Sequence, residues 1–106
     1  MMSYSRFFQF LDYAAVYVCC EANPLIKNCD ISHCKDVGLF IIGSATGIYE
    51  DNTISCNAND GIYIVDEAQP TMRRNKIHQN RAGIYIFAGS GCFEDNKIYN
   101  NEIGIF

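Results

Sequence analysis

Two Glu-Asp pairs, Glu50-Asp51 and Glu94-Asp95, have the side chains needed for acid–base chemistry. Two carboxyl groups that converge on one bond can act as general acid and general base. An Arg-Arg pair, Arg73-Arg74, stands between them in the sequence, at spacings of 73 − 50 = 23 and 94 − 73 = 21 residues. Charges that alternate in sign at a near-constant spacing favour ion pairs between neighbouring strands. We therefore interpret these residues as an ion-pair ladder and predict that the chain is not an enzyme.

Histidine and cysteine are common zinc ligands, and the chain has two histidines and six cysteines. His33, Cys34 and Cys56 could approach one another, but their spacing matches no established zinc pattern. The sequence also has no Gly-rich phosphate loop, nucleophile elbow or His-Glu-x-x-His motif. We predict neither a metal site nor a cofactor.

Asparagine recurs at Asn52, Asn75 and Asn96, each time two residues before an isoleucine, at spacings of 75 − 52 = 23 and 96 − 75 = 21. Side-chain amides that stack in register can hydrogen-bond from strand to strand. We predict that these three residues form a structural ladder. A similar set follows at Asn57, Asn80 and Asn101.

A second anchor has the same period. It is a run of glycine, apolar, aromatic and apolar residues that begins at Gly38, Gly61, Gly83 and Gly104, with spacings of 61 − 38 = 23, 83 − 61 = 22 and 104 − 83 = 21. Two anchors with one period indicate a repeat protein. Leucine-rich repeats need leucine at fixed offsets, and this chain has only Leu11, Leu25 and Leu39.

Short β-branched and aromatic runs, broken by Gly, Asn and Asp, instead favour strands and turns. We predict an all-β fold, a right-handed single-stranded parallel β-helix of about four coils of 21–23 residues. Each coil should hold three strands, as at 70–74, 76–78 and 83–87. Successive coils should lie about 4.8 Å apart.

The alternation of side chains along a strand assigns the two faces of the third strand. If Ile62 and Ile64 point inward, Tyr63 points outward. The same parity places an aromatic stripe outside, with Cys19, Ile42, Val65 and Phe87 beside it. We predict that the stripe and its flank bind a partner through Tyr17, Phe40, Tyr63, Tyr85 and Phe87, with Phe106 as the last ring of the stripe. The alternatives are a self-supporting aromatic ladder and the opposite parity.

Residues 1–12 carry no repeat, and residues 13–106 form the repeats. We expect the N-terminal segment to fold over the first coil as a cap; a signal peptide is the alternative, although Asp12 interrupts its apolar run. The repeats stop inside an apolar strand. We therefore expect either a fragment of a longer solenoid or end-to-end self-association.

Eight basic and twelve acidic side chains argue against a nucleic-acid partner, and no run of 18 apolar residues predicts a membrane span. The cysteines take ordinary repeat positions: Cys29 stands in the asparagine column, and Cys92 stands in the column of Ile48 and Thr71. We predict thiols in a reducing compartment, with a Cys34–Cys56 disulfide as the alternative.

Three runs resemble a known family: 22–31 (ANPLIKNCDI), 47–52 (GIYEDN) and 69–78 (QPTMRRNKIH). They resemble the repeats of the β-helical F-box-only proteins, which are grouped with carbohydrate-binding proteins and sugar hydrolases. The resemblance covers residues 16–106. It implies recognition of ubiquitin-ligase substrates in the cytoplasm or nucleus, without catalysis. We expect no F-box within this sequence, since residues 1–12 are too short to hold one.

The predicted function is therefore a non-catalytic protein-binding scaffold. The alternative is a β-helix that binds or cleaves a polysaccharide, which would need carboxylates converging in a groove. Sugar rings could also stack on the aromatic stripe, so a glycan is the second partner class.

Overall fold

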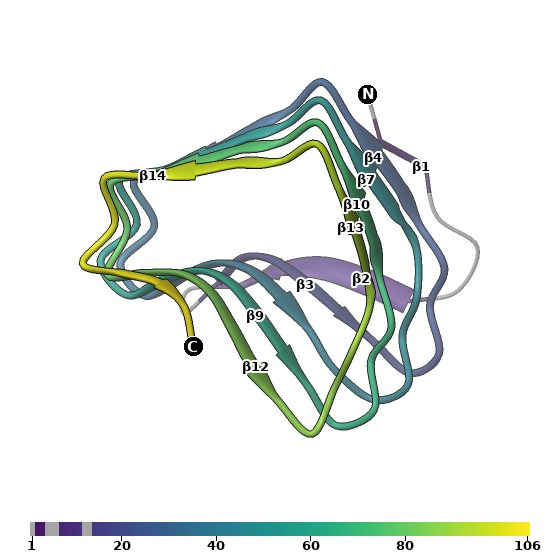
Figure 1. Ribbon diagram of the computed structural model, residues 1–106. Coiled ribbons are helices and arrows are strands. Elements are labelled where there is room, and N and C mark those ends of the chain that lie inside the picture. Colours follow the sequence, from purple (N-terminus) through teal and green to yellow (C-terminus); the bar gives the residue numbers. More distant parts are fainter. Residues whose placement is uncertain (1, 4–6, 12–13) are drawn as a thin grey trace.

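The computed structural model describes residues 2–3, 7–11 and 14–106, and from Ala14 onward the chain winds into four stacked coils (Figure 1). Each coil gives one strand to each of three sheets. Sheet A has the order β1 (Met2–Ser3), β4 (Leu25–Lys27), β7 (Ile48–Glu50), β10 (Thr71–Arg73) and β13 (Cys92–Glu94). Sheet B has the order β15 (Ile103–Ile105), β12 (Ala82–Phe87), β9 (Asp60–Val65), β6 (Val37–Ile41), β3 (Ala14–Cys19) and β2 (Phe7–Leu11). Sheet C has the order β14 (Lys97–Tyr99), β11 (Lys76–His78), β8 (Thr53–Ser55) and β5 (Asp30–Ser32).

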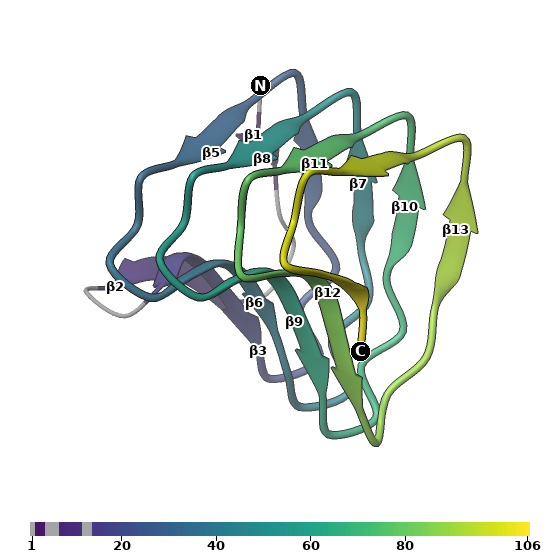
Figure 2. The same cartoon turned by 60° about the vertical axis from the view of Figure 1, so that its left-hand side comes forward.

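Strands of successive coils pair in parallel and in register. Figure 2 shows the strands of each sheet side by side. Ile54 pairs with Ile77, and Tyr63 pairs with Tyr85, so identical or similar residues stack in columns. This arrangement confirms the predicted fold class, a parallel β-solenoid of about four coils. The predicted strands at 70–74, 76–78 and 83–87 correspond to β10, β11 and β12.

The two N-terminal strands run the other way. β1 pairs antiparallel with β4, and β2 pairs antiparallel with β3, so they extend sheets A and B beyond the first coil. In sheet C, β5 is the last of the described strands at this end. Of the predicted N-terminal segment, residues 1, 4–6 and 12 lie outside the described part of the chain, as does Tyr13.

The core is a set of stacked apolar columns, and the predicted parity is confirmed. The inward column of sheet B consists of Val16, Leu39, Ile62 and Ile84, with Val18, Ile41 and Ile64 beside it, all buried. Sheet C contributes Ile31, Ile54 and Ile77, and sheet A contributes Ile26, Tyr49 and Met72. Tyr49 has a polar end inside this core, and its hydroxyl donates to the Thr46 carbonyl at 2.7 Å. Burial raises the pKa of that hydroxyl, so it stays a hydrogen-bond donor.

The coils turn at three corners, and each corner uses left-handed backbone. The A–C corner has Asn28, Asp51, Arg74 and Asp95 at φ of 54–57°. The C–B corner has His33, Cys56, Gln79 and Asn100 at φ of 53–59°. The B–A corner has Cys20 with Glu21, Gly43 with Ser44, Asp66 with Glu67, and Ala88. This conformation costs a residue with a Cβ roughly 1–2 kcal/mol, so the stacking of the strands must offset it at every turn.

Coil length changes only at two of these corners. The pairing offset is 76 − 53 = 23 residues between β8 and β11, and 82 − 60 = 22 between β9 and β12. It is 92 − 71 = 21 between β10 and β13 and 97 − 76 = 21 between β11 and β14. One residue is therefore lost at the C–B corner before β12 and one at the B–A corner before β13. The A–C corner keeps its length.

A lack of space accounts for three glycines, Gly38, Gly61 and Gly83, that stand second in β6, β9 and β12. A Cβ on Gly61 would lie 2.8 Å from Nδ2 of Asn80 and 2.9 Å from the Gly83 carbonyl oxygen. We expect Gly61→Ala to lower the free energy of unfolding by about 1–3 kcal/mol, because the asparagine and the backbone must move apart. Urea denaturation measures this change.

Gly104→Ala is the matched control for Gly61→Ala. A Cβ on Gly104 meets no heavy atom within 4 Å, so its free energy of unfolding should stay near that of the unchanged chain. Equal losses in the two variants would contradict the explanation by space and would point to a conformational role of the glycines.

Candidate functional surface

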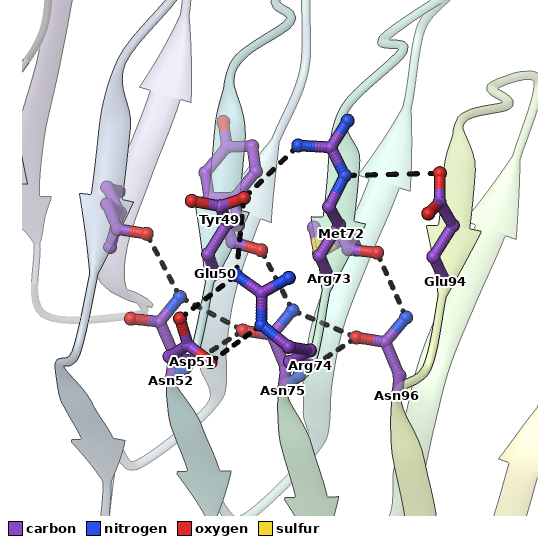
Figure 3. A network of polar contacts seen from close by, with 11 residues as sticks. Tyr49, Glu50, Asp51, Asn52, Met72, Arg73, Arg74, Asn75, Glu94 and Asn96 are labelled. Atoms are coloured by element: carbon purple, nitrogen blue, oxygen red, sulfur yellow. Dashed lines mark hydrogen bonds and ion pairs between the residues drawn. The ribbon is translucent and has the colours of Figure 1, made fainter.

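The charged residues of the A–C corner form ion pairs across three coils (Figure 3). Nη1 of Arg73 donates to Oε2 of Glu50 at 3.1 Å, and its Nε lies 3.9 Å from Oε1 of Glu94. Arg74 binds Asp51 with two hydrogen bonds, from Nε at 3.0 Å and from Nη2 at 3.2 Å. The carboxylates of Glu50 and Glu94 therefore flank an arginine and do not face a shared substrate position, in agreement with the predicted ion-pair ladder.

Asp51 shows the electrostatic effect of this ladder. The hydrogen bonds from Arg74 hold the pKa of the Asp51 carboxyl below its ordinary value, and they outweigh the opposing desolvation. Because the pKa of Asp51 is lower in the folded state than in the unfolded state, ionised Asp51 stabilises the fold. This stabilisation is complete when the pH is above the unfolded-state pKa. It is lost as the pH falls through the folded-state pKa.

We expect Arg74→Gln to raise the pKa of Asp51 toward its ordinary value and to weaken this acid dependence of stability. A carboxyl-carbon NMR titration of both proteins measures the pKa directly. Lys35→Gln serves as the control, because it also removes one positive charge. An unchanged Asp51 pKa in Arg74→Gln would contradict the assignment.

Beneath the ion pairs, the asparagine ladder crosses the same corner (Figure 3). Oδ1 of Asn75 accepts from the backbone N–H of Asn52 at 3.0 Å and from its side-chain amide at 3.1 Å. Nδ2 of Asn75 donates to the Tyr49 carbonyl at 3.0 Å and to Oδ1 of Asn96 at 3.0 Å. Each amide thus supplies partners to backbone groups that the corner leaves unpaired. At the N-terminal end, the backbone N–H of Cys29 donates to Oδ1 of Asn52 at 2.9 Å.

A second asparagine ladder crosses the C–B corner in the same way. Nδ2 of Asn57 donates to Oδ1 of Asn80 at 2.9 Å, and Nδ2 of Asn80 donates to Oδ1 of Asn101 at 3.1 Å. Nδ2 of Asn80 also donates to the Ile54 carbonyl at 3.2 Å. Within the described residues, no buried side-chain nitrogen or oxygen lacks a hydrogen-bond partner.

Beside this corner lies a polar network that the sequence analysis missed. Nη2 of Arg81 lies 2.8 Å from Oδ1 of the buried Asp60, and its Nε donates to Oδ1 of Asn59. Nδ2 of Asn59 in turn donates to Oδ1 of Asp36 at 2.9 Å. Burial raises the pKa of Asp60, while the Arg81 charge opposes that rise. The near-constant spacings, 59 − 36 = 23 and 81 − 59 = 22, were the signal that could have revealed the column of Asp36, Asn59 and Arg81.

Metal ligands do not converge anywhere in the described part of the chain: no group of three or more His, Cys, Asp or Glu side chains could hold a metal ion. All six cysteines lie in residues 14–106 and are thiols, so Cys34 and Cys56 are not bridged. His78 stacks on Tyr99 with ring centroids 4.8 Å apart, on the outside of sheet C.

On the outside of sheet B, five aromatic rings form one column, and each ring contacts the next in an edge-to-face or tilted arrangement. The centroid distances are 5.4 Å for Tyr17 and Phe40, 4.8 Å for Phe40 and Tyr63, 4.9 Å for Tyr63 and Tyr85, and 4.7 Å for Tyr85 and Phe106. These distances lie in the range of favourable aromatic pairs. We call this column the outer aromatic stripe. Its first four rings are half-buried, because each ring covers part of the next.

The flank of the stripe is less exposed than the sequence suggested. Val65 is 8% exposed and Cys19 is 7% exposed, whereas Phe87 is 64% exposed. Val65 pairs with Phe87 of the next coil, so a neighbouring strand lies beside it, and Cys19 pairs with Phe7 of β2. The accessible part of the surface is therefore formed by the stripe, the half-buried Ile42 and Phe87.

Pockets also lie away from this surface. One, of about 350 Å³, is lined by residues of the first coil, among them Val16, Ile26 and Ile31. Another lies at the B–A corner around Pro70 and Gly91, and a third lies at the A–C corner around Arg74 and Lys97.

The geometry is that of a solenoid scaffold, and a comparison with protein families agrees with it. The family described as "Right handed beta helix region" matches residues 3–106, nearly the whole chain. The chain therefore belongs to the right-handed β-helix family. No solved structure matches it. Within the described residues, no helix has the length and apolar character required to cross a membrane.

Proposed function

We propose that this β-helix is a non-catalytic scaffold that binds a protein partner through the outside of sheet B. The contact residues in this proposal are Tyr17, Phe40, Tyr63, Tyr85 and Phe87. The observation that carries it is the unbroken column of aromatic rings along that face, with the centroids of neighbouring rings 4.7–5.4 Å apart.

A stacked ring is well suited to protein recognition. Each ring is held by its neighbours in the column, so it loses little conformational freedom when a partner binds. Tyrosine combines a large apolar surface with a hydroxyl, and it is enriched among the residues that dominate binding energy. Partial burial raises the pKa of the Tyr63 hydroxyl, which keeps it protonated as a donor.

The acidic groups support a role without catalysis. The three carboxylates of Glu50, Asp51 and Asp60 are all within ion-pair distance of an arginine. An acid–base pair would need two carboxyls that face the same bond, and the alternating charges of the A–C corner do not provide that arrangement.

We further propose that the partner is a substrate of a ubiquitin ligase and that binding takes place in the cytoplasm or nucleus. The likeness of the runs at 47–52 and 69–78 to the repeats of β-helical F-box-only proteins supports a role in ubiquitin-ligase substrate recognition. The thiol state of all six cysteines supports the reducing cytoplasm or nucleus as the location.

Site-specific photo-crosslinking tests the binding surface. A photoreactive phenylalanine in place of Ile42, which flanks the stripe, should crosslink a discrete partner protein in cells. Tyr63→Ala with Tyr85→Ala should reduce this product strongly, since loss of a central tyrosine contact costs about 2 kcal/mol of binding energy. Circular dichroism should show unchanged β structure in the double variant.

Tyr99→Ala is the matched control, because Tyr99 is an exposed tyrosine on sheet C. It should leave the crosslink intact. An equal loss of the product in Tyr99→Ala and in the double variant would contradict a partner site on sheet B. A crosslinked dimer of the chain itself would indicate self-association instead.

The second candidate function is glycan binding, which the same aromatic rings favour because sugar rings stack on aromatic faces. It predicts a change in tyrosine fluorescence on titration with neutral or acidic oligosaccharides, and loss of that change in Tyr63→Ala. A flat titration together with a protein crosslink would exclude this candidate.

A further inference from the structure

Two adjacent cysteines, Cys19 and Cys20, bring their sulfur atoms together where β3 enters the B–A corner. The two Sγ atoms lie 3.0 Å apart. Cys20 is exposed, whereas Cys19 is 7% exposed. An exposed cysteine therefore has its sulfur close to that of a buried one. The contact residues of the proposed partner surface do not include this pair.

The backbone fixes the pair in place. Cys20 and Glu21 both have left-handed backbone, at φ of 58° and 61°. The N–H of Ala22 donates to the Cys19 carbonyl at 3.0 Å, and the N–H of Glu21 donates to the Gly43 carbonyl at 3.1 Å. The turn is thus closed on itself and attached to the next coil. A ligand that binds both sulfurs meets them already positioned, which lowers the entropy cost of binding.

A direct disulfide suits this pair poorly. Adjacent Cα atoms are about 3.8 Å apart across a trans peptide, whereas disulfides usually join Cα atoms about 4.4–6.8 Å apart. A bond between neighbours is therefore strained and easily reduced. A third atom placed between the sulfurs closes a larger ring and avoids this strain.

Zinc also suits the pair poorly, because it needs three or four protein ligands. No cluster of three or more His, Cys, Asp or Glu ligands forms within the described residues. The two sulfurs are better suited to an atom that needs only two sulfur ligands from the protein and carries its own third substituent. Soft, thiophilic centres also prefer sulfur ligands to oxygen.

We propose that Cys19 and Cys20 form a dithiol site for a trivalent arsenical or a similar thiophilic centre, which bridges both sulfurs. The exposed Cys20 sulfur reacts first. Burial raises the pKa of the Cys19 thiol to about 11, with a further contribution from Cys20. Cys19 therefore enters the second step as a protonated thiol.

The reaction with an arsenic(III) oxide group is balanced without an oxidant. Two arsenic–sulfur bonds form, and two S–H bonds and the arsenic–oxygen double bond break. The two thiol protons leave with that oxygen as one water molecule. The oxidation states of arsenic and sulfur do not change.

Phenylarsine oxide is the probe for this site. The full chain, reduced with a phosphine, should bind one equivalent by intact-mass analysis and lose two of its six titratable thiols. Because the second bond forms within one molecule, excess monothiol should leave the adduct in place, whereas a 1,2-dithiol should remove it. Peptide mapping should place the arsenical on the peptide that contains Cys19 and Cys20.

Cys20→Ser tests the ring, because it removes an exposed sulfur and retains Cys19. The monothiol concentration that removes half of its adduct should be about a hundredfold lower than for the unchanged chain. Cys56→Ser, which removes another exposed cysteine, should behave like the unchanged chain. An adduct that maps to other cysteines, or one that persists equally in Cys20→Ser, would overturn the proposal.

Discussion

Asn75→Leu should lower the free energy of unfolding by about 4 kcal/mol, because at least two buried backbone groups lose their partners. The side chain of Asn75 is fully buried. Its removal leaves the N–H of Asn52 and the carbonyl of Tyr49 without the hydrogen bonds that the ladder supplies. Domains of this size are stabilised by only about 5–15 kcal/mol, so a large part of the folded state's stability depends on one amide. Urea denaturation followed by circular dichroism measures the loss.

Asn23→Leu is the matched control for Asn75→Leu. Asn23 is exposed. Its Oδ1 accepts a hydrogen bond from the Thr46 hydroxyl at 3.1 Å, on the surface of the protein. Such a surface change should stay within about 0.5 kcal/mol of the unchanged chain. If the two variants unfold at the same urea concentration, the asparagine ladder does not stabilise the fold as described.

Ile64→Asn should cost about 3 kcal/mol or more, and it acts through a different physical cause. Ile64 is fully buried in the inward column of sheet B. The substitution buries an amide that has no partner and removes apolar contacts from the column. Thermal unfolding and the yield of soluble protein should both fall.

Ile48→Asn makes the same chemical change at an isoleucine that is 39% exposed. Here the amide can bind water, so the loss should be much smaller. Similar melting temperatures for the two variants would show that the inward column is not the core of the solenoid.

The sequence predicted the coil well because register limits what can stand at each position. Strands stack in parallel at a fixed offset, so a buried amide such as Asn75 needs another amide in the next coil. The same constraint places Tyr63 against Tyr85 and repeats an inward aliphatic in every coil. In each column the same residue types recur with one period, and this period can be read from the sequence alone.

Features that depend on single residues were not visible in that way. Arg74 and Ala88 have left-handed backbone, although neither residue type favours it, because the stacked strands on both sides impose the turn. Asp60 meets Arg81 from a different repeat column, so the period does not connect them. The low exposure of Val65 could not be predicted either. Strand parity predicts which way a side chain points, but not whether neighbouring residues cover it.

The binding role of the stripe is also beyond the reach of a periodic pattern. The spacing predicts that Tyr63 and Tyr85 are neighbours, and their rings do meet, edge to face, with centroids 4.9 Å apart. This contact would be the same whether the rings support only each other or also contact a partner. The crosslinking and titration experiments are therefore the tests of function.

The unequal coil lengths have a consequence for how such a chain can diverge or be redesigned. Residues are lost at the C–B and B–A corners, while the strands on both sides keep their pairing. A loop grafted near Asp66 and Glu67 should therefore be tolerated, whereas an insertion between Arg73 and Asn75 would displace the amide from its stack. The length of the chain can therefore change at the C–B and B–A corners, whereas it is constant at the A–C corner. Peptides could be displayed by inserting them at the first two corners.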